Sequence, residues 1–204
     1  LQAVNKGPRA MTTHFKFAML APVLLLGGCI SFGGDAPDSL LTLTPTASAP
    51  AGAAESSNAS TAISLMEFEA PSALDVTRVP VQVTDTELAY LEDAVWVEKP
   101  ARLFRRLIAE TIRTQSNRVV IDGDDPGVLA DNRLTGTLRQ FGYDARSGSV
   151  VVVFDAVRPG QGSDVVTRRF EATVPGVLPE TASVGPALNQ AANDVAAQIA
   201  AWIG

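Results

Sequence analysis

The most restrictive feature of this chain is an apolar run that ends in two glycines and a cysteine, at residues 24–29. The apolar segment around it, residues 17–26, has only half the roughly 20 residues that a membrane-spanning helix needs. Small residues before the cysteine let an extended backbone enter a peptidase groove, and Cys29 is the only strong nucleophile nearby. This pattern is typical of a bacterial lipoprotein signal. We expect cleavage after Gly28 and diacylglycerol attachment at Cys29, which confines the fold to the chain beyond residues 1–28.

The sequence upstream agrees with a secretory signal. Met11 is expected to be the true start, because residues 1–10 show neither an apolar run nor a helical period. His14 and Lys16 supply a weak positive charge ahead of the apolar segment. The alternative is a buried first helix that ends in a core cysteine. Pro22 and the glycine pair argue against a packed helix there.

The lipid anchor bears on localisation. Each buried acyl CH₂ contributes about 0.8 kcal/mol, and stable anchoring takes more than one chain, so a Cys29 that carries several chains stays on its membrane. The next residue, Ile30, is not aspartate. By resemblance to enterobacterial lipoproteins, this favours export to the outer membrane. We expect a lipid-anchored, periplasm-facing protein with no cofactor apart from the covalent lipid.

Charge and composition exclude several functions. The chain has 16 Lys and Arg against 22 Asp and Glu, and loss of Lys6, Arg9 and Lys16 leaves 13 basic residues and a net charge near −9. Such a balance argues against nucleic acid as a partner. The only histidine, His14, leaves with the signal, and the only cysteine is consumed by lipid. Ser-His-Asp catalysis, the usual zinc sites and histidine pH switches are therefore not expected.

The remaining chain divides into a linker and one domain. Residues 29–62 are rich in Ser, Ala, Thr, Gly and Pro, which predicts a flexible tether interrupted by a short strand at 40–44. Residues 63–204 are enough for one core. Apolar patterning in this part predicts strands at 63–68, 79–83, 119–121, 133–143, 150–157 and 165–174. Pro80 pushes the second of these towards a sheet edge or a bulge.

Two amphipathic helices complete the predicted domain. Pro100 is placed to begin the first, which should end near Asn117. The second should begin at about Pro186, and its apolar stripe consists of Leu188, Ala192, Val195, Ile199 and Trp202. We therefore expect an α+β domain in which a single, mostly antiparallel sheet carries both helices on one face.

Several short motifs follow the lipoprotein signal in a fixed order: Leu40-Leu41-Thr42-Leu43-Thr44-Pro45, Leu74-Asp75, Trp96-Val97-Glu98-Lys99-Pro100, and two strands at 134–143 and 150–156. With the alanine-rich terminal helix, this order resembles the family of ABC-type transport auxiliary lipoprotein components. Leu40-Leu41 stands where that family has an aromatic pair. The resemblance covers most of the chain after the signal, and none of its motifs is a catalytic fingerprint.

The resemblance implies a non-enzymatic accessory to an envelope lipid transporter. In such systems an inner-membrane ATPase and permease work with a periplasmic mammalian-cell-entry (MCE) protein, and the auxiliary lipoprotein docks that machinery at the outer membrane. The expected partners are therefore an MCE-family protein and the ABC transporter complex.

The candidate residues for partner docking lie in the first predicted helix and just before it. Arg102, Arg105 and Arg106 form a positive patch that could meet an acidic partner or phospholipid headgroups. They could equally be a solvated helix face, with Glu98 and Arg102 in helical i,i+4 register. Trp96 could anchor a partner, since Trp is enriched at interface hot spots, or it could plug the core between sheet and helix.

Other candidate sites have simpler explanations. The acidic residues 122–125 resemble a calcium loop, but Arg133 stands where an EF-hand needs a bidentate glutamate, so no metal site is expected. Glu67 and Glu69 share one strand face without another catalytic carboxylate opposite them. Tyr90 and Phe141 could line a lipid-sized groove or belong to the core.

Two other functions remain open. A lipid carrier would hold its cargo in an enclosed apolar cavity between the sheet and the helices. An envelope-assembly lipoprotein would act on peptidoglycan synthesis or lipopolysaccharide export, and fold alone does not separate these roles. An alternating strand edge with Pro80 also permits a homo-oligomer.

Overall fold

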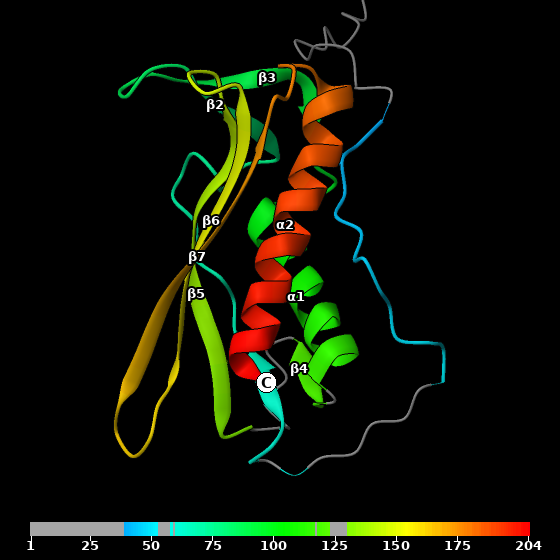
Figure 1. Ribbon diagram of the computed structural model, residues 1–204, viewed down its shortest axis with the longest axis vertical. Helices are drawn as coiled ribbons and strands as arrows, with labels where there is room; N and C mark the ends of the chain where they lie inside the picture. The colour runs from blue at the N-terminus through cyan, green and yellow to red at the C-terminus, as the bar shows by residue number, and fades with distance from the viewer. Residues whose placement is uncertain (1–38, 53–57, 59, 117, 123–129) are drawn as a thin grey trace, which may run out of the picture. The chain divides into compact units, whose positions relative to one another are not determined.

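A computed structural model describes residues 39–52, 58, 60–116, 118–122 and 130–204 of the chain. Its folded unit extends from Pro37 to Gly204. The elements follow in the order β1 (Ile63–Leu65), β2 (Arg78–Gln82), β3 (Leu88–Val95), α1 (Pro100–Ser116), β4 (Val120–Asp122), β5 (Asn132–Asp144), β6 (Ser149–Pro159), β7 (Val165–Pro175) and α2 (Thr181–Ile203) (Figure 1).

The strands form one seven-stranded mixed sheet around β5. One edge of β5 pairs antiparallel with β6, which pairs antiparallel with β7. The other edge is shared by β1 and β2, both parallel to β5, and these strands continue to β4 and β3. The expected α+β class and the two helices are confirmed, and the sheet is mostly but not wholly antiparallel.

The apolar stripes of the two helices pack side by side on one face of the sheet (Figure 1). On β6, Val152, Phe154 and Ala156 belong to the core, because alternate residues of a strand point to the same face. Rings of Phe104 and Phe154 meet at a centroid distance of 5.5 Å, which ties α1 to this strand. The core is fully packed here, and Leu188 of α2 is also completely buried.

Pro80 lies at a bulge. The sequence predicted either a sheet edge or a bulge at this residue. The pairing register between β2 and β3 shifts between Arg78 and Pro80. β2 is not an edge strand, because it lies between β3 and β5. Proline has no N–H to donate to a ladder, so the irregularity lets it occupy an interior strand.

The second helix begins five residues earlier than Pro186. It starts at Thr181, and Pro186 lies inside it with an exposed ring. Pro186 is the sixth residue of α2, so the helix lacks the hydrogen bond that an N–H at this position would donate to the Ala182 carbonyl, and the buried apolar face of the helix maintains it despite this loss. The prediction of a boundary at this proline was wrong. In contrast, α1 begins at Pro100 and ends at Ser116, as expected.

Residues 40–49, expected to lie in a flexible tether, are docked along the helices instead (Figure 1). We call them the strap. The Leu41 N–H donates to the Val95 carbonyl, and its side chain packs against Gly185 of α2. Further along, the amide of Asn193 accepts hydrogen bonds from the Thr46 N–H and hydroxyl at 2.9 Å each. Specific acceptors on α2 thus hold a segment whose composition resembles a linker.

Candidate docking surfaces

The lipidation and cleavage positions, Cys29 and Gly28, lie outside the described residues. So does most of the acidic segment 122–127, since the description resumes at residue 130. Among the described residues, no group of three His, Cys, Asp or Glu side chains is arranged to hold a metal ion. None of the described helices is long and apolar enough to cross a membrane.

Trp96 lies in the core rather than on a surface. It is 1 % exposed, and its ring lies 5.5 Å from that of Phe141 between centroids. The chain at this position is also covered by the strap, because the Val97 N–H donates to the Leu41 carbonyl at 2.9 Å. Of the two interpretations of this tryptophan, the structure therefore supports the core plug, and Trp96 offers no surface to a partner.

The three arginines of α1 differ in their surroundings. Arg105 is half-buried and forms an ion pair with Asp122 at the end of β4, with 3.1 Å between Nε and Oδ1. Arg106 pairs with Glu98, whereas the sequence register suggested that Glu98 would pair with Arg102. Arg102 is exposed and has no ion-pair partner among the described residues.

These arginines line a shallow hollow of about 180 Å³ together with Glu67 and Glu98. We call this set the α1 arginine surface. Glu67 shares this hollow with one other carboxylate, Glu98, which forms an ion pair with Arg106. Because Arg102 is unpaired and Arg106 is 53 % exposed, the surface can still offer N–H donors to an acidic group.

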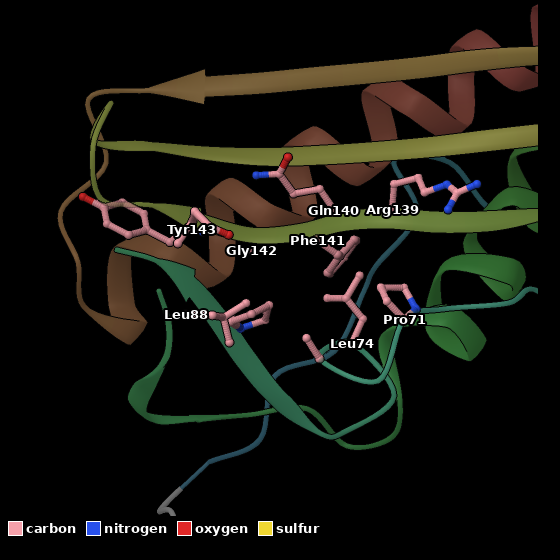
Figure 2. Close-up of a pocket in the computed structure, with 11 residues that line it drawn as sticks. Pro71, Leu74, Leu88, Arg139, Gln140, Phe141, Gly142 and Tyr143 are labelled. Atoms are coloured by element: carbon pink, nitrogen blue, oxygen red, sulfur yellow. The ribbon is translucent and has the colours of Figure 1, made fainter. Parts of the chain in front are cut away.

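A second hollow, which we call the notch, lies where β5 passes the β2–β3 hairpin and the turn before it. Its volume is about 80 Å³. Figure 2 shows Leu74, Leu88 and Phe141 around it, with Arg139 and Gln140 on β5 at its border. Tyr90 is not part of its lining; its hydroxyl donates to the Ala73 carbonyl at 3.4 Å. Tyr90 and Phe141 therefore do not share a lipid-sized groove.

A third site lies on the face of the sheet opposite the helices, which we call the outer face. Asp155 of β6 faces outwards because its neighbours Phe154 and Ala156 face the core. Its carboxylate accepts from Arg139 Nε at 2.9 Å, and from Arg169 Nε and Nη2 at 2.6 and 2.8 Å. Three neighbouring strands thus each contribute one charged side chain to a bonded cluster.

The arginines stabilise the charged form of this carboxylate. The hydrogen bonds from Arg169, opposed by partial desolvation and followed by those from Arg139, lower the pKa of Asp155 to about 2. In return, the bonded carboxylate raises the pKa of Arg169. The cluster is therefore fully ionised at neutral pH.

This cluster was not predicted from the sequence, although both of its arginines lie in predicted strands. Arg139 lies in the strand predicted at 133–143, and Arg169 lies beside Arg168 in the strand predicted at 165–174. Their meeting depends on the pairing registers of the three strands, which place Thr137 of β5 and Arg169 of β7 opposite Asp155, with Arg139 on the same face as Thr137. Local sequence patterns do not specify these registers.

Comparisons with known proteins show which family and which solved structures this chain resembles. A family model described as "ABC-type transport auxiliary lipoprotein component" matches residues 41–200, which include the strap, the sheet and nearly all of both helices. The comparison with curated proteins gives no match.

Solved structures show a similar fold. A protein from Xanthomonas campestris of the family DUF330 aligns with a TM-score of 0.66 and 18 % identity, over 80 % of this chain and 94 % of that chain. An uncharacterized protein aligns with a TM-score of 0.62 and 15 % identity, over 81 % and 100 %. A PelC dodecamer from Paraburkholderia phytofirmans reaches only 0.44 at 15 % identity, over 76 % and 94 %, and carries no argument here.

Proposed function

Since the chain belongs to the family of ABC-type transport auxiliary lipoprotein components, we propose that it is a non-enzymatic accessory of an MCE-type lipid transport system. In this proposal the protein is acylated at Cys29, faces the periplasm from the outer membrane, and docks or stabilises the transporter there. Its partners are the MCE protein and, through it, the permease and ATPase.

The observation that carries the proposal is the filled space between the helices and the sheet. Phe104, Ile108, Leu188 and Ile199 point into this space and are completely buried. A lipid carrier needs a cavity there, since pockets for small ligands enclose about 300–1,000 Å³. The two hollows described above open to the outside of the domain. The packing therefore favours a docking protein over a carrier.

The α1 arginine surface is the part of the domain that we assign to docking. Arg102 and Arg106 keep exposed guanidinium groups on a chain whose overall charge is −6. Exposed positive charge on an acidic protein attracts an acidic partner and favours its approach to this surface. We therefore expect the MCE protein to present carboxylates to this surface.

The test is affinity purification of the detergent-solubilised, full-length lipoprotein from its native host, followed by mass spectrometry. We expect an MCE protein with its permease and ATPase. Recovery of peptidoglycan synthases or a lipopolysaccharide-export protein instead would contradict the proposal. Lipid recovered in a one-to-one ratio with the purified protein would favour the carrier.

A pair of variants tests the surface itself. Arg102→Glu combined with Arg106→Glu should reduce recovery of the MCE protein about tenfold, because a charge-assisted contact contributes about 1.5–3 kcal/mol. Arg78→Glu combined with Arg133→Glu, at two exposed positions that line none of the hollows described, is the matched control for the change in charge. Equal recovery with both variants would exclude the α1 arginine surface as the docking site.

A further inference from the structure

Arg139 borders two hollows at once, and this links the notch to the outer face. On one side it borders the notch, with Leu74 and Leu88. On the other it borders an open hollow of about 430 Å³ that spans β5, β6 and β7 and is lined by Asp155 and Arg169. An apolar hollow and a charged hollow are therefore adjacent on the same surface.

The charged hollow carries an excess of positive charge. Three arginines and one aspartate line it, and the third arginine is Arg168. Both oxygens of Asp155 are already engaged by Arg139 and Arg169. The side chains of these two arginines are nevertheless 56 % and 63 % exposed. Guanidinium groups have five N–H donors each, so donors remain for a further anion.

The size of the notch decides what can occupy it. A volume of about 80 Å³ is well below the roughly 300 Å³ at which pockets for small ligands begin. It accommodates one aliphatic side chain and not a long acyl chain. Its apolar lining includes Pro71, Leu74 and Leu88, and Leu88 is 45 % exposed at the rim. A partner side chain can therefore complete the burial of Leu88.

We propose that this surface binds an acidic segment of a protein partner. One aliphatic side chain of the segment occupies the notch, and neighbouring carboxylates bind Arg139 and Arg169. Aromatic or aliphatic anchors in pockets beside arginines are the usual energetic centres of protein interfaces. Its charged part lies on the sheet face opposite the helices, and none of its lining residues belongs to the α1 arginine surface, so it does not depend on that surface.

A defined peptide tests the proposal on the detergent-solubilised full-length protein. The probe is a fluorescein-labelled peptide of sequence Gly-Leu-Asp-Glu-Asp-Gly with a blocked C-terminus, and fluorescence anisotropy measures its binding. We expect saturable binding that weakens about tenfold with Arg139→Glu and Arg169→Glu, and that is unchanged with Arg133→Glu, an exposed position on β5 that lines neither hollow. A peptide with Lys in place of its three acids should not bind.

Further variants separate binding from folding. Leu88→Ser changes an exposed position, so the fold should persist while the affinity for the peptide falls several-fold. Replacement of the peptide leucine by glycine should have the same effect. Absence of saturable binding up to 1 mM would overturn the proposal. It would also be overturned if glycerol phosphate displaced the peptide and the leucine made no difference, because the arginines would then be sites for lipid headgroups.

Discussion

At the scale of single residues, the charged cluster of the outer face shows how a strand register creates chemistry. Asp155 becomes a strong acid only because β5 and β7 bring Arg139 and Arg169 to its two oxygens. The carboxylate is 24 % exposed, so solvent screens part of the attraction. The free energy of unfolding should therefore depend on pH in the range where Asp155 titrates.

Asp155 should contribute to acid lability in a defined pH window. Its folded-state pKa of about 2 lies below the value of about 3.9 expected in an unfolded chain. The stabilisation is therefore complete above pH 4 and is lost as the pH falls from 4 towards 2. Urea unfolding at several pH values should show a shallower decline for Asp155→Asn than for the unchanged protein. Identical slopes would contradict this prediction.

A second residue-scale prediction concerns the backbone at Asp93. This residue of β3 has a φ of 54°, which lies in the left-handed region of backbone conformation. Residues other than Gly, Asn and Asp rarely occupy this region. Asp93 is exposed, so a substitution loses little packing. Asp93→Val should lower the free energy of unfolding by about 1–2 kcal/mol. Asp93→Asn should leave it within about 0.5 kcal/mol, and equal losses for both variants would exclude backbone strain as the cause.

At the scale of elements, the strap is the feature that local patterns least reveal. Its composition is that of a linker, and its partners Asn189 and Asn193 are about 145 residues away in sequence. The Thr44 N–H donates to Asn189 Oδ1 at 2.8 Å, and Asn193 Nδ2 donates to the Thr44 carbonyl at 3.0 Å. Both asparagines lie inside the predicted second helix, and nothing in the sequence indicates that they bind backbone groups of a segment so far away.

Removal of one asparagine should loosen the strap without unfolding the domain. Asn193→Ala removes its hydrogen bonds to Thr44 and Thr46, each contributing about 0.5–1.5 kcal/mol. Hydrogen exchange at Thr46 should therefore become at least about tenfold faster, while exchange in β6 stays the same. Gln190→Ala, an exposed position on the same helix, is the control. Unchanged exchange at Thr46 would show that other contacts hold the strap.

Regular elements, in contrast, were largely predictable. The three long strands and α1 carry strong periodic signals, and the structure confirms them. The errors occur where tertiary contacts override local preferences. Pro186 lies inside α2 because the buried apolar residues of this helix hold it in place despite one missing hydrogen bond. Glu98 pairs with Arg106 and not with Arg102 because the chain before Pro100 is not helical.

The candidate surfaces were less predictable than the fold. The three α1 arginines are close in sequence, so their proximity followed from helical spacing alone. The site on the outer face depends on the pairing registers of β5, β6 and β7. Registers of this kind are decided by the core on the other face of the sheet, and sequence patterns do not specify them residue by residue.

At the scale of the whole molecule, Phe104 connects the helical layer to the sheet. Its ring contacts Phe141 of β5 at 6.1 Å and Phe154 of β6 at 5.5 Å between centroids. Phe104→Ala should lower the free energy of unfolding by about 3–5 kcal/mol, because it leaves a cavity in a closely packed core. Val165→Ala, at a residue that is 68 % exposed, should change it by less than about 0.5 kcal/mol. Urea denaturation measures both.

The strap also determines how far the protein can work from its membrane. If lipid is attached to Cys29, the reach of the domain is limited by the length of chain from Cys29 to Leu41, where the contacts of the strap begin, and not by the length up to the first strand. A fully extended chain between Cys29 and Leu41 spans at most about 40 Å, compared with about 115 Å between Cys29 and Ile63. The strap thus shortens the working radius of the domain roughly threefold, and a partner has to come to the membrane surface to meet it.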